Sequence, residues 1–242
     1  MNDIRRTTAE ELAGLLRARI HRGELSPGDR LPAERDLAAQ LGVARVTVRG
    51  ALGALQQEGY LEVRRGATGG RFVTELAEPY GRWRTTMAAD LGELTAVLEY
   101  RTALERQVAV LAAGRRTTAH LRRMRRAIED LGAATTPEEF RRADDAFHTA
   151  LGAAAKNHLL AAAVADARGR LFSPTDRLGF EAHVETSRAA HQAVFDAVAA
   201  GDADGAAAAI ERHLSETAGE LVEVLSPRAA TARRPAGPRA RR

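Results

Sequence analysis

The sequence predicts a mainly α-helical protein with two parts, an N-terminal unit of three helices and a short β-hairpin, and a C-terminal all-α helical bundle. The chain has 242 residues, which exceeds one typical domain and suits two, each with its own core. Strand-like residues flank a glycine-rich turn only within residues 60–75. From about residue 90 to 225, apolar residues recur at helical spacing with no convincing strand.

The N-terminal unit is predicted from its helix starts, helix stops and turns. The helices are expected at residues 8–21, 34–41 and 45–58, with a Pro-Gly turn after the first and glycines that end the second and third. Two strands are expected at 60–64 and 71–75. This order of elements is that of a winged helix-turn-helix.

The third helix is the candidate for reading DNA. Val48, Leu52 and Leu55 form one apolar stripe, which leaves Arg45 and Arg49 on the outward side. Arginine binds guanine through two hydrogen bonds in the major groove, and threonine reaches phosphate or a thymine methyl group. We therefore expect DNA contacts from the residues of this helix that face outward: Arg45, Thr47 and Arg49.

Further basic residues flank this helix. Arg35 begins the second helix, where it can bind backbone phosphate and set the register without reading sequence. The hairpin adds Arg64, Arg65 and Arg71 beside glycines that allow the backbone to approach a duplex. The alternative is that these arginines only solvate the surface.

The amino-acid sequence of this segment favours DNA binding. The stretch LPAERDLAAQLGVARVTVRGAL at residues 31–52, followed by QEGYLEV at 57–63, resembles the DNA-binding domain of the GntR family of bacterial regulators over residues 8–74. The resemblance implies DNA contacts at the matching positions, which are Arg35, Ala44, Arg45, Thr47, Arg49 and the wing glycine Gly66.

The reading helix departs from the family pattern. Ala44 stands where such sequences commonly carry Ser or Asn, so a side-chain helix cap that contributes about 1 kcal/mol is missing. Gly50 and Gly53 each cost about 0.5–1 kcal/mol relative to alanine. We therefore expect this helix to be less ordered when free and to tighten on DNA.

The remaining chain divides by composition. We assign residues 1–75 to the winged unit, 76–89 to an irregular linker, 90–225 to the bundle and 226–242 to a disordered basic tail, whose contribution to DNA affinity is left open. The bundle helices are expected near residues 90–114, 117–131, 137–154, 157–172, 180–200 and 202–225.

Inward-facing polar residues mark the bundle. Asp144 and His148 lie four residues apart on the apolar side of one helix, and His191 and His213 lie on apolar faces of two others. A single histidine of this kind is more often a hydrogen-bonded core residue, but the four together favour a metal site. Imidazoles with one carboxylate suit Zn, Ni, Mn or Fe(II) and leave positions open for a ligand.

Arg101 is a candidate for binding an acid. It falls in the middle of an apolar stripe, where an unpaired guanidinium is costly. It forms a salt bridge with a protein acid such as Asp144, or it binds a small carboxylate together with the metal. Asn157 is a weaker candidate for a further hydrogen bond to that carboxylate.

The bundle also carries a resemblance. EYRTALE at residues 99–105, DDAFH at 144–148 and the interval from His191 to His213 resemble the helical effector-binding domain of the FadR branch, called the FCD domain. The resemblance implies metal ligands at Asp144, His148, His191 and His213 and an organic-acid effector. His158 and His183 do not match ligand positions.

Composition limits the remaining classes. The absence of cysteine excludes disulfides and thiolate metal sites. With no leader and no apolar run of the roughly 20 residues that span a bilayer, we expect a cytoplasmic protein without a membrane partner.

Together these observations predict a transcriptional regulator rather than an enzyme. We expect a homodimeric repressor that binds a pseudo-palindromic DNA operator, with a small organic acid at the metal site changing its operator affinity. The alternatives are a regulator for which the metal itself is the signal and, with less support, a metal-dependent enzyme.

Overall fold

The computed structural model describes residues 7–66, 68–172 and 180–225, which form ten α-helices and one two-stranded antiparallel sheet. The N-terminal unit, here called the reading head, contains α1 (Ala9–His21), α2 (Glu34–Leu41), α3 (Arg45–Gln57), β1 (Leu61–Arg64) and β2 (Gly70–Val73). The predicted mainly α fold is confirmed, and every predicted element of the head is present. The predicted tail at 226–242 lies outside the described residues.

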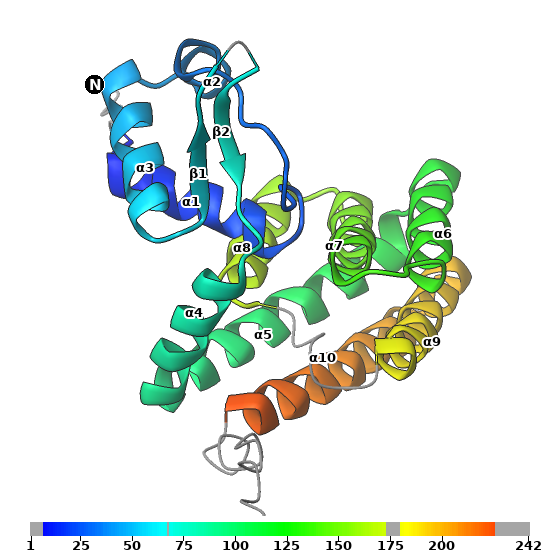
Figure 1. The fold of residues 1–242 in the computed structure, drawn as a ribbon. Coiled ribbons are helices and arrows are strands. Elements are labelled where there is room, and N and C mark those ends of the chain that lie inside the picture. Colours follow the sequence, from blue (N-terminus) through cyan, green and yellow to red (C-terminus); the bar gives the residue numbers. More distant parts are fainter. Residues whose placement is uncertain (1–6, 67, 173–179, 226–242) are drawn as a thin grey trace, which may run out of the picture.

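The head is held together by the apolar faces of α1 and α3. Thr8 caps α1 through a reciprocal bond with Glu11, which satisfies backbone donors at the helix start. Val48 and Leu55 of α3 are fully buried against Leu16 and Ile20 of α1. In Figure 1, α2 lies at the end of the head away from the bundle.

A helix joins the head to the bundle. The segment predicted to be irregular is α4 (Ala77–Ala89), and that expectation is wrong. Pro79 lies in the first turn, where a missing N–H costs nothing, and Trp83 is buried with its indole N–H donating to Arg170 O at 3.0 Å. Tertiary packing therefore stabilises a helix whose own sequence has a weak apolar stripe.

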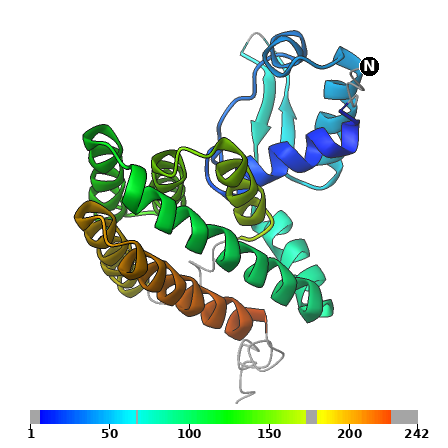
Figure 2. The same ribbon diagram turned by 180° about the vertical axis from the view of Figure 1, so that it is seen from behind.

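The bundle consists of six helices whose bounds lie within three residues of those expected. They are α5 (Leu91–Arg115), α6 (Thr118–Gly132), α7 (Pro137–Ala154), α8 (His158–Gly169), α9 (Phe180–Ala200) and α10 (Ala203–Leu225). The long helices α5 and α10 run side by side in both views, with α9 along α10 and α7 beside α6 (Figures 1 and 2). None of the described helices is long and apolar enough to cross a membrane.

The head and the bundle share one apolar cluster. α8 lies between α1 and α5 (Figure 2), and a single buried cluster continues from Leu16 of α1 through Trp83 to Leu221 of α10. Gly169 ends α8 so close to α1 that an added Cβ would lie 2.3 Å from Ala18 Cβ. The position of α1 is therefore tied closely to that of α8.

Candidate metal and ligand site beneath a DNA-reading head

The four predicted metal ligands come together inside the bundle. The Thr136 capping box and Pro137 fix the start of α7, and this register directs Asp144 and His148 to one face. His191 of α9 and His213 of α10 meet them, and one donor atom from each of the four residues lies within 4.8 Å of the others. The shortest separations are 3.3 Å between the Nε2 atoms of His191 and His213, and 3.4 Å from His191 Nε2 to Asp144 Oδ1.

The protonation of these residues suits a metal ion. Burial lowers the pKa of His148 to about 4 and those of His191 and His213 to about 3, so all three are neutral at pH 7. Burial alone would raise the pKa of Asp144, but the positive charge of Arg168 lowers it well below its usual value. The site therefore offers three neutral imidazoles and one carboxylate, which are the forms that bind a metal.

One orphaned atom supports the fit to a metal. His148 Nδ1 lies 2.5 Å from Glu105 Oε2, so Nδ1 carries the proton and Nε2 has a free lone pair. His148 Nε2 is buried, lies 3.8 Å from Asp144 Oδ1, and has no hydrogen-bond partner among the described residues. A buried acceptor without a donor is costly, and a divalent cation among the four ligands would satisfy it.

Arg101 forms its salt bridge with a residue other than Asp144, the partner suggested by the sequence. Its Nε donates to Glu105 Oε1 at 2.7 Å, one turn along α5, and both side chains are buried. Burial alone would raise the pKa of Glu105, but His148 and Arg101 hold it well below its usual value. The salt bridge is therefore to Glu105 and not to Asp144, and Glu105 also orients His148.

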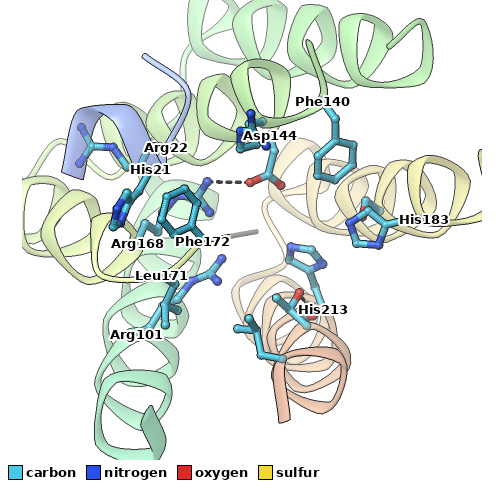
Figure 3. A pocket seen from close by; sticks show the side chains of 14 residues that line it. His21, Arg22, Arg101, Phe140, Asp144, Arg168, Leu171, Phe172, His183 and His213 are labelled. Atoms are coloured by element: carbon cyan, nitrogen blue, oxygen red, sulfur yellow. Dashed lines mark hydrogen bonds and ion pairs between the residues drawn. The ribbon is translucent and has the colours of Figure 1, made fainter. Parts of the chain in front are cut away.

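Asp144 is instead held by a residue that the sequence analysis did not identify. Arg168, near the end of α8, donates from Nη2 to Asp144 Oδ2 at 2.7 Å, as drawn in Figure 3. Asp144 Oδ1 is left to face the histidines. No sequence signal identifies Arg168, whereas the four-residue interval from Arg101 to Glu105 could have indicated their pairing.

A small cavity is lined by two of the four residues, Asp144 and His213. Figure 3 shows Arg101, Asp144, Arg168 and His213 directed toward it from four different helices. Its volume is about 50 Å³. Asn157 does not line it, because its side-chain oxygen accepts from Leu159 N and Leu160 N as the cap of α8. Asn157 therefore has a structural role that accounts for it.

The predicted DNA-contacting residues lie on the surface of the head. Arg35, Arg45, Arg49 and Arg65 are exposed, as are Ala44 and Gly66, and Thr47 is half-buried. Ala44 precedes α3 with no side-chain cap, as expected from its residue type. Gly66 has φ +106°, a conformation that favours glycine, and nothing lies within 4 Å of an added Cβ, so the backbone of the wing is open to a partner.

Glu34 is a further residue of this surface that the sequence analysis did not identify. It accepts from Arg49 Nε at 3.2 Å and from Arg71 Nη1 at 2.8 Å, so one carboxylate joins the reading helix to the wing. The hydrogen bond from Arg71 is the main reason that the pKa of Glu34 is lowered. Glu34 thus lies between two arginines, one from α3 and one from β2.

Comparison with known proteins identifies both parts of the chain. Residues 8–73 match the profile of "Bacterial regulatory proteins, gntR family", and residues 96–216 match that of the "FCD domain". The "Putative L-lactate dehydrogenase operon regulatory protein" of Escherichia coli is 35% identical over 227 residues, covering 87% of this chain and 84% of the relative. The "HTH-type transcriptional regulator LutR" of Bacillus subtilis is 33% identical over 216 residues, covering 81% and 93%.

A solved structure shows the same fold. Escherichia coli McbR/YncC superimposes with a TM-score of 0.55 at 18% identity, covering 90% of this chain and 98% of that chain. The Bacillus subtilis relative is named as a transcriptional regulator, and the Escherichia coli relative is named as a putative operon regulatory protein. The chain therefore belongs to the GntR family of bacterial regulatory proteins, and it is a DNA-binding transcriptional regulator with an FCD domain.

Proposed function

We propose that the chain is a homodimeric repressor whose affinity for a pseudo-palindromic operator is changed by a small organic acid bound at a metal-loaded site in the bundle. The observation that carries this proposal is the cluster of Asp144 and three neutral histidines, whose donor atoms lie close enough together to bind one metal ion. This cluster lies beside a cavity lined by Arg101 and Arg168. A metal ion held there would supply positive charge and open coordination positions for a carboxylate. Zn, Ni, Mn and Fe(II) all suit these donors.

The residues of the cavity define the proposed ligand. Arg101 lies at one side with its charge shared with Glu105, and Arg168 lies at another with its charge shared with Asp144. Two guanidinium groups beside a cation favour an anionic group. The cavity is far below the roughly 300–1,000 Å³ of sites for drug-sized ligands, which favours an acid of few atoms. The name of the Escherichia coli relative refers to L-lactate dehydrogenase, so L-lactate is the first acid to test.

The proposed DNA contacts follow the exposed surface of the head. Arg45, Thr47 and Arg49 would read bases in the major groove, with Arg35 and the backbone at Ala44 on phosphate. Arg65 and Gly66 would bring the wing to the duplex. A two-fold dimer places two heads on two half-sites, which is the reason to expect a pseudo-palindromic operator.

The proposal is tested by titrating operator affinity. An operator duplex is selected from a random library with the wild-type chain, and its affinity is measured after chelation, with each metal alone, and with metal plus L-lactate, acetate or citrate. We expect a change of at least fivefold with metal and one acid, because coupling of two sites is typically about 1–3 kcal/mol. His191→Ala should abolish metal binding in calorimetry and the response to acid, while operator binding of the chelated chain persists.

The second candidate function is a regulator that senses the metal itself. The orphaned His148 Nε2 favours it, because this atom requires only a cation to be satisfied. A full response to metal alone, with no further change on adding any acid, would select this candidate over the acid-responsive one.

A further inference from the structure

The cavity beside the metal ligands is closed on one side by the reading head. His21 and Arg22, at the end of α1, line it together with Asp144 and Arg168 of the bundle (Figure 3). His21 is buried, with Nδ1 bonded to Gly169 O at 2.8 Å and Nε2 bonded to Tyr60 Oη at 2.7 Å. The end of α1, the helix that packs against α3, therefore forms part of the lining of the proposed ligand site.

A row of alternating charges crosses this wall. Asp144 accepts from Arg168, and Arg168 Nε lies 3.7 Å from Asp145 Oδ1. Asp145 Oδ1 in turn lies 3.3 Å from Arg22 Nε, and Arg22 Nη1 donates to Ala165 O at 2.6 Å. All four charged side chains are largely buried, so their attractions are screened less than those on a surface.

Arg168 is incompletely paired in this row. Its Nε is buried and has no hydrogen-bond partner among the described residues, although it faces Asp145. A buried donor without an acceptor is unfavourable, and a small movement toward Asp145 would satisfy it. Such a movement would weaken the bond of Arg168 to Asp144 and strengthen its contact with Asp145.

We propose that Arg168 and Asp145 couple the Asp144 site to the placement of the reading head, an inference that rests on the proposed metal site. When Asp144 binds a cation, its carboxylate attracts Arg168 less strongly, and Arg168 pairs with Asp145. Asp145 then holds Arg22 less strongly, so α1 loses an ion pair to the bundle. Because Gly169 touches Ala18, a change at this end of α1 moves the whole helix against α8.

The inference is tested with Asp145→Asn, which keeps the shape of the side chain and removes its charge. Asp145 is neither one of the four proposed ligands nor a residue that lines the cavity. The readout is the ratio of operator affinities with and without Zn²⁺, with Zn²⁺ binding measured separately by calorimetry. We expect a ratio of at least fivefold in the wild type and less than twofold in Asp145→Asn, with Zn²⁺ affinity unchanged.

Arg142→Gln is the matched control. Arg142 also joins α7 to the head, through a 3.0 Å bond to Ser26 Oγ, but it has no place in the row of charges. It should keep the wild-type ratio even if the melting temperature falls. If Asp145→Asn does not fold, Arg22→Gln removes the other half of the same ion pair. Because Arg22 also lines the cavity, Zn²⁺ binding of this variant is measured by calorimetry, and the ratio should fall while Zn²⁺ affinity is unchanged.

The outcomes separate this inference from the proposed function. An Asp145→Asn chain, or an Arg22→Gln chain in its place, that keeps the wild-type ratio overturns the coupling and leaves the metal-dependent regulator intact. A wild-type chain that binds Zn²⁺ with no change in operator affinity overturns the coupling but not the metal site. Failure of the wild type to bind Zn²⁺ overturns the metal site and the coupling together.

Discussion

At the scale of single residues, Glu34 is expected to orient Arg49, one of the proposed DNA contacts. Its carboxylate binds both Arg49 and Arg71, so the reading helix and the wing are held by one acid. We expect Glu34→Gln to weaken discrimination between operator and altered sites several-fold, because Arg49 loses a fixed orientation, and to strengthen binding to unrelated DNA, because a negative charge is removed. Competition binding at one salt concentration measures both.

Glu10→Gln is the control for charge alone. Glu10 is exposed at the start of α1, and its substitution by glutamine removes the same charge from the head. It should raise affinity for all duplexes without changing discrimination. Equal discrimination by Glu34→Gln and wild type would contradict the orienting role of Glu34.

At the scale of elements, the two glycines of α3 differ in whether their surroundings leave room for a side chain. An added Cβ at Gly53 meets nothing within 4 Å, whereas one at Gly50 would lie 2.9 Å from Ala9 Cβ of α1. Gly53→Ala should stabilise the chain by about 0.5–1 kcal/mol. Gly50→Ala should destabilise it, because overpacking costs about 1–3 kcal/mol and exceeds the helix gain. Urea unfolding of the two variants compares them, and a stabilising Gly50→Ala would contradict the close contact.

The stability of α3 in the free protein is also expected to affect DNA binding. The helix has no side-chain cap at Ala44 and contains two glycines, so it remains our prediction that the free helix opens locally and tightens on the operator. Hydrogen exchange of residues 45–57 measures this. Equal protection with and without operator would count against it.

At the scale of the whole molecule, the contact between head and bundle should depend on pH through His21. Burial lowers the pKa of His21 from 6.5 to about 3, so below pH 6.5 the unfolded chain binds a proton that the folded chain does not. The stability from this residue is complete above pH 6.5 and is lost as the pH falls toward 3, with a slope approaching 1.4 kcal/mol per pH unit.

His21→Gln isolates this contribution. Glutamine can still donate to Gly169 O and accept from Tyr60, but it does not titrate. Chemical unfolding from pH 6.5 to 4, in the presence of a chelator, should give a smaller pH slope for the variant than for the wild type. The histidines of the metal site contribute equally to both chains, and identical slopes would contradict the neutral, buried state of His21.

The sequence by itself determined the elements other than α4, and it singled out the four residues that meet inside the bundle. Thr136, Pro137 and the glycines that end helices act within a few residues, so the bounds of α7 and of the head follow from local chemistry. The spacing of Asp144 and His148 places both on one face of a helix. The histidines of α9 and α10 lie on apolar faces, which already favoured one shared site, and the resemblance to a known domain implied the same four residues.

Only the tertiary structure decided which charges pair and where the head sits. Arg168 takes Asp144 because this pairing depends on how α7 and α8 pack, whereas Arg101 pairs with Glu105 one turn along the same helix, α5. α4 likewise forms because Trp83 is buried against other elements. The contact of His21 with Gly169 joins residues 148 positions apart, and no local pattern encodes such a distance. Periodicity reports which face of a helix is buried, but the partner on that face is fixed only when helices from distant parts of the chain meet.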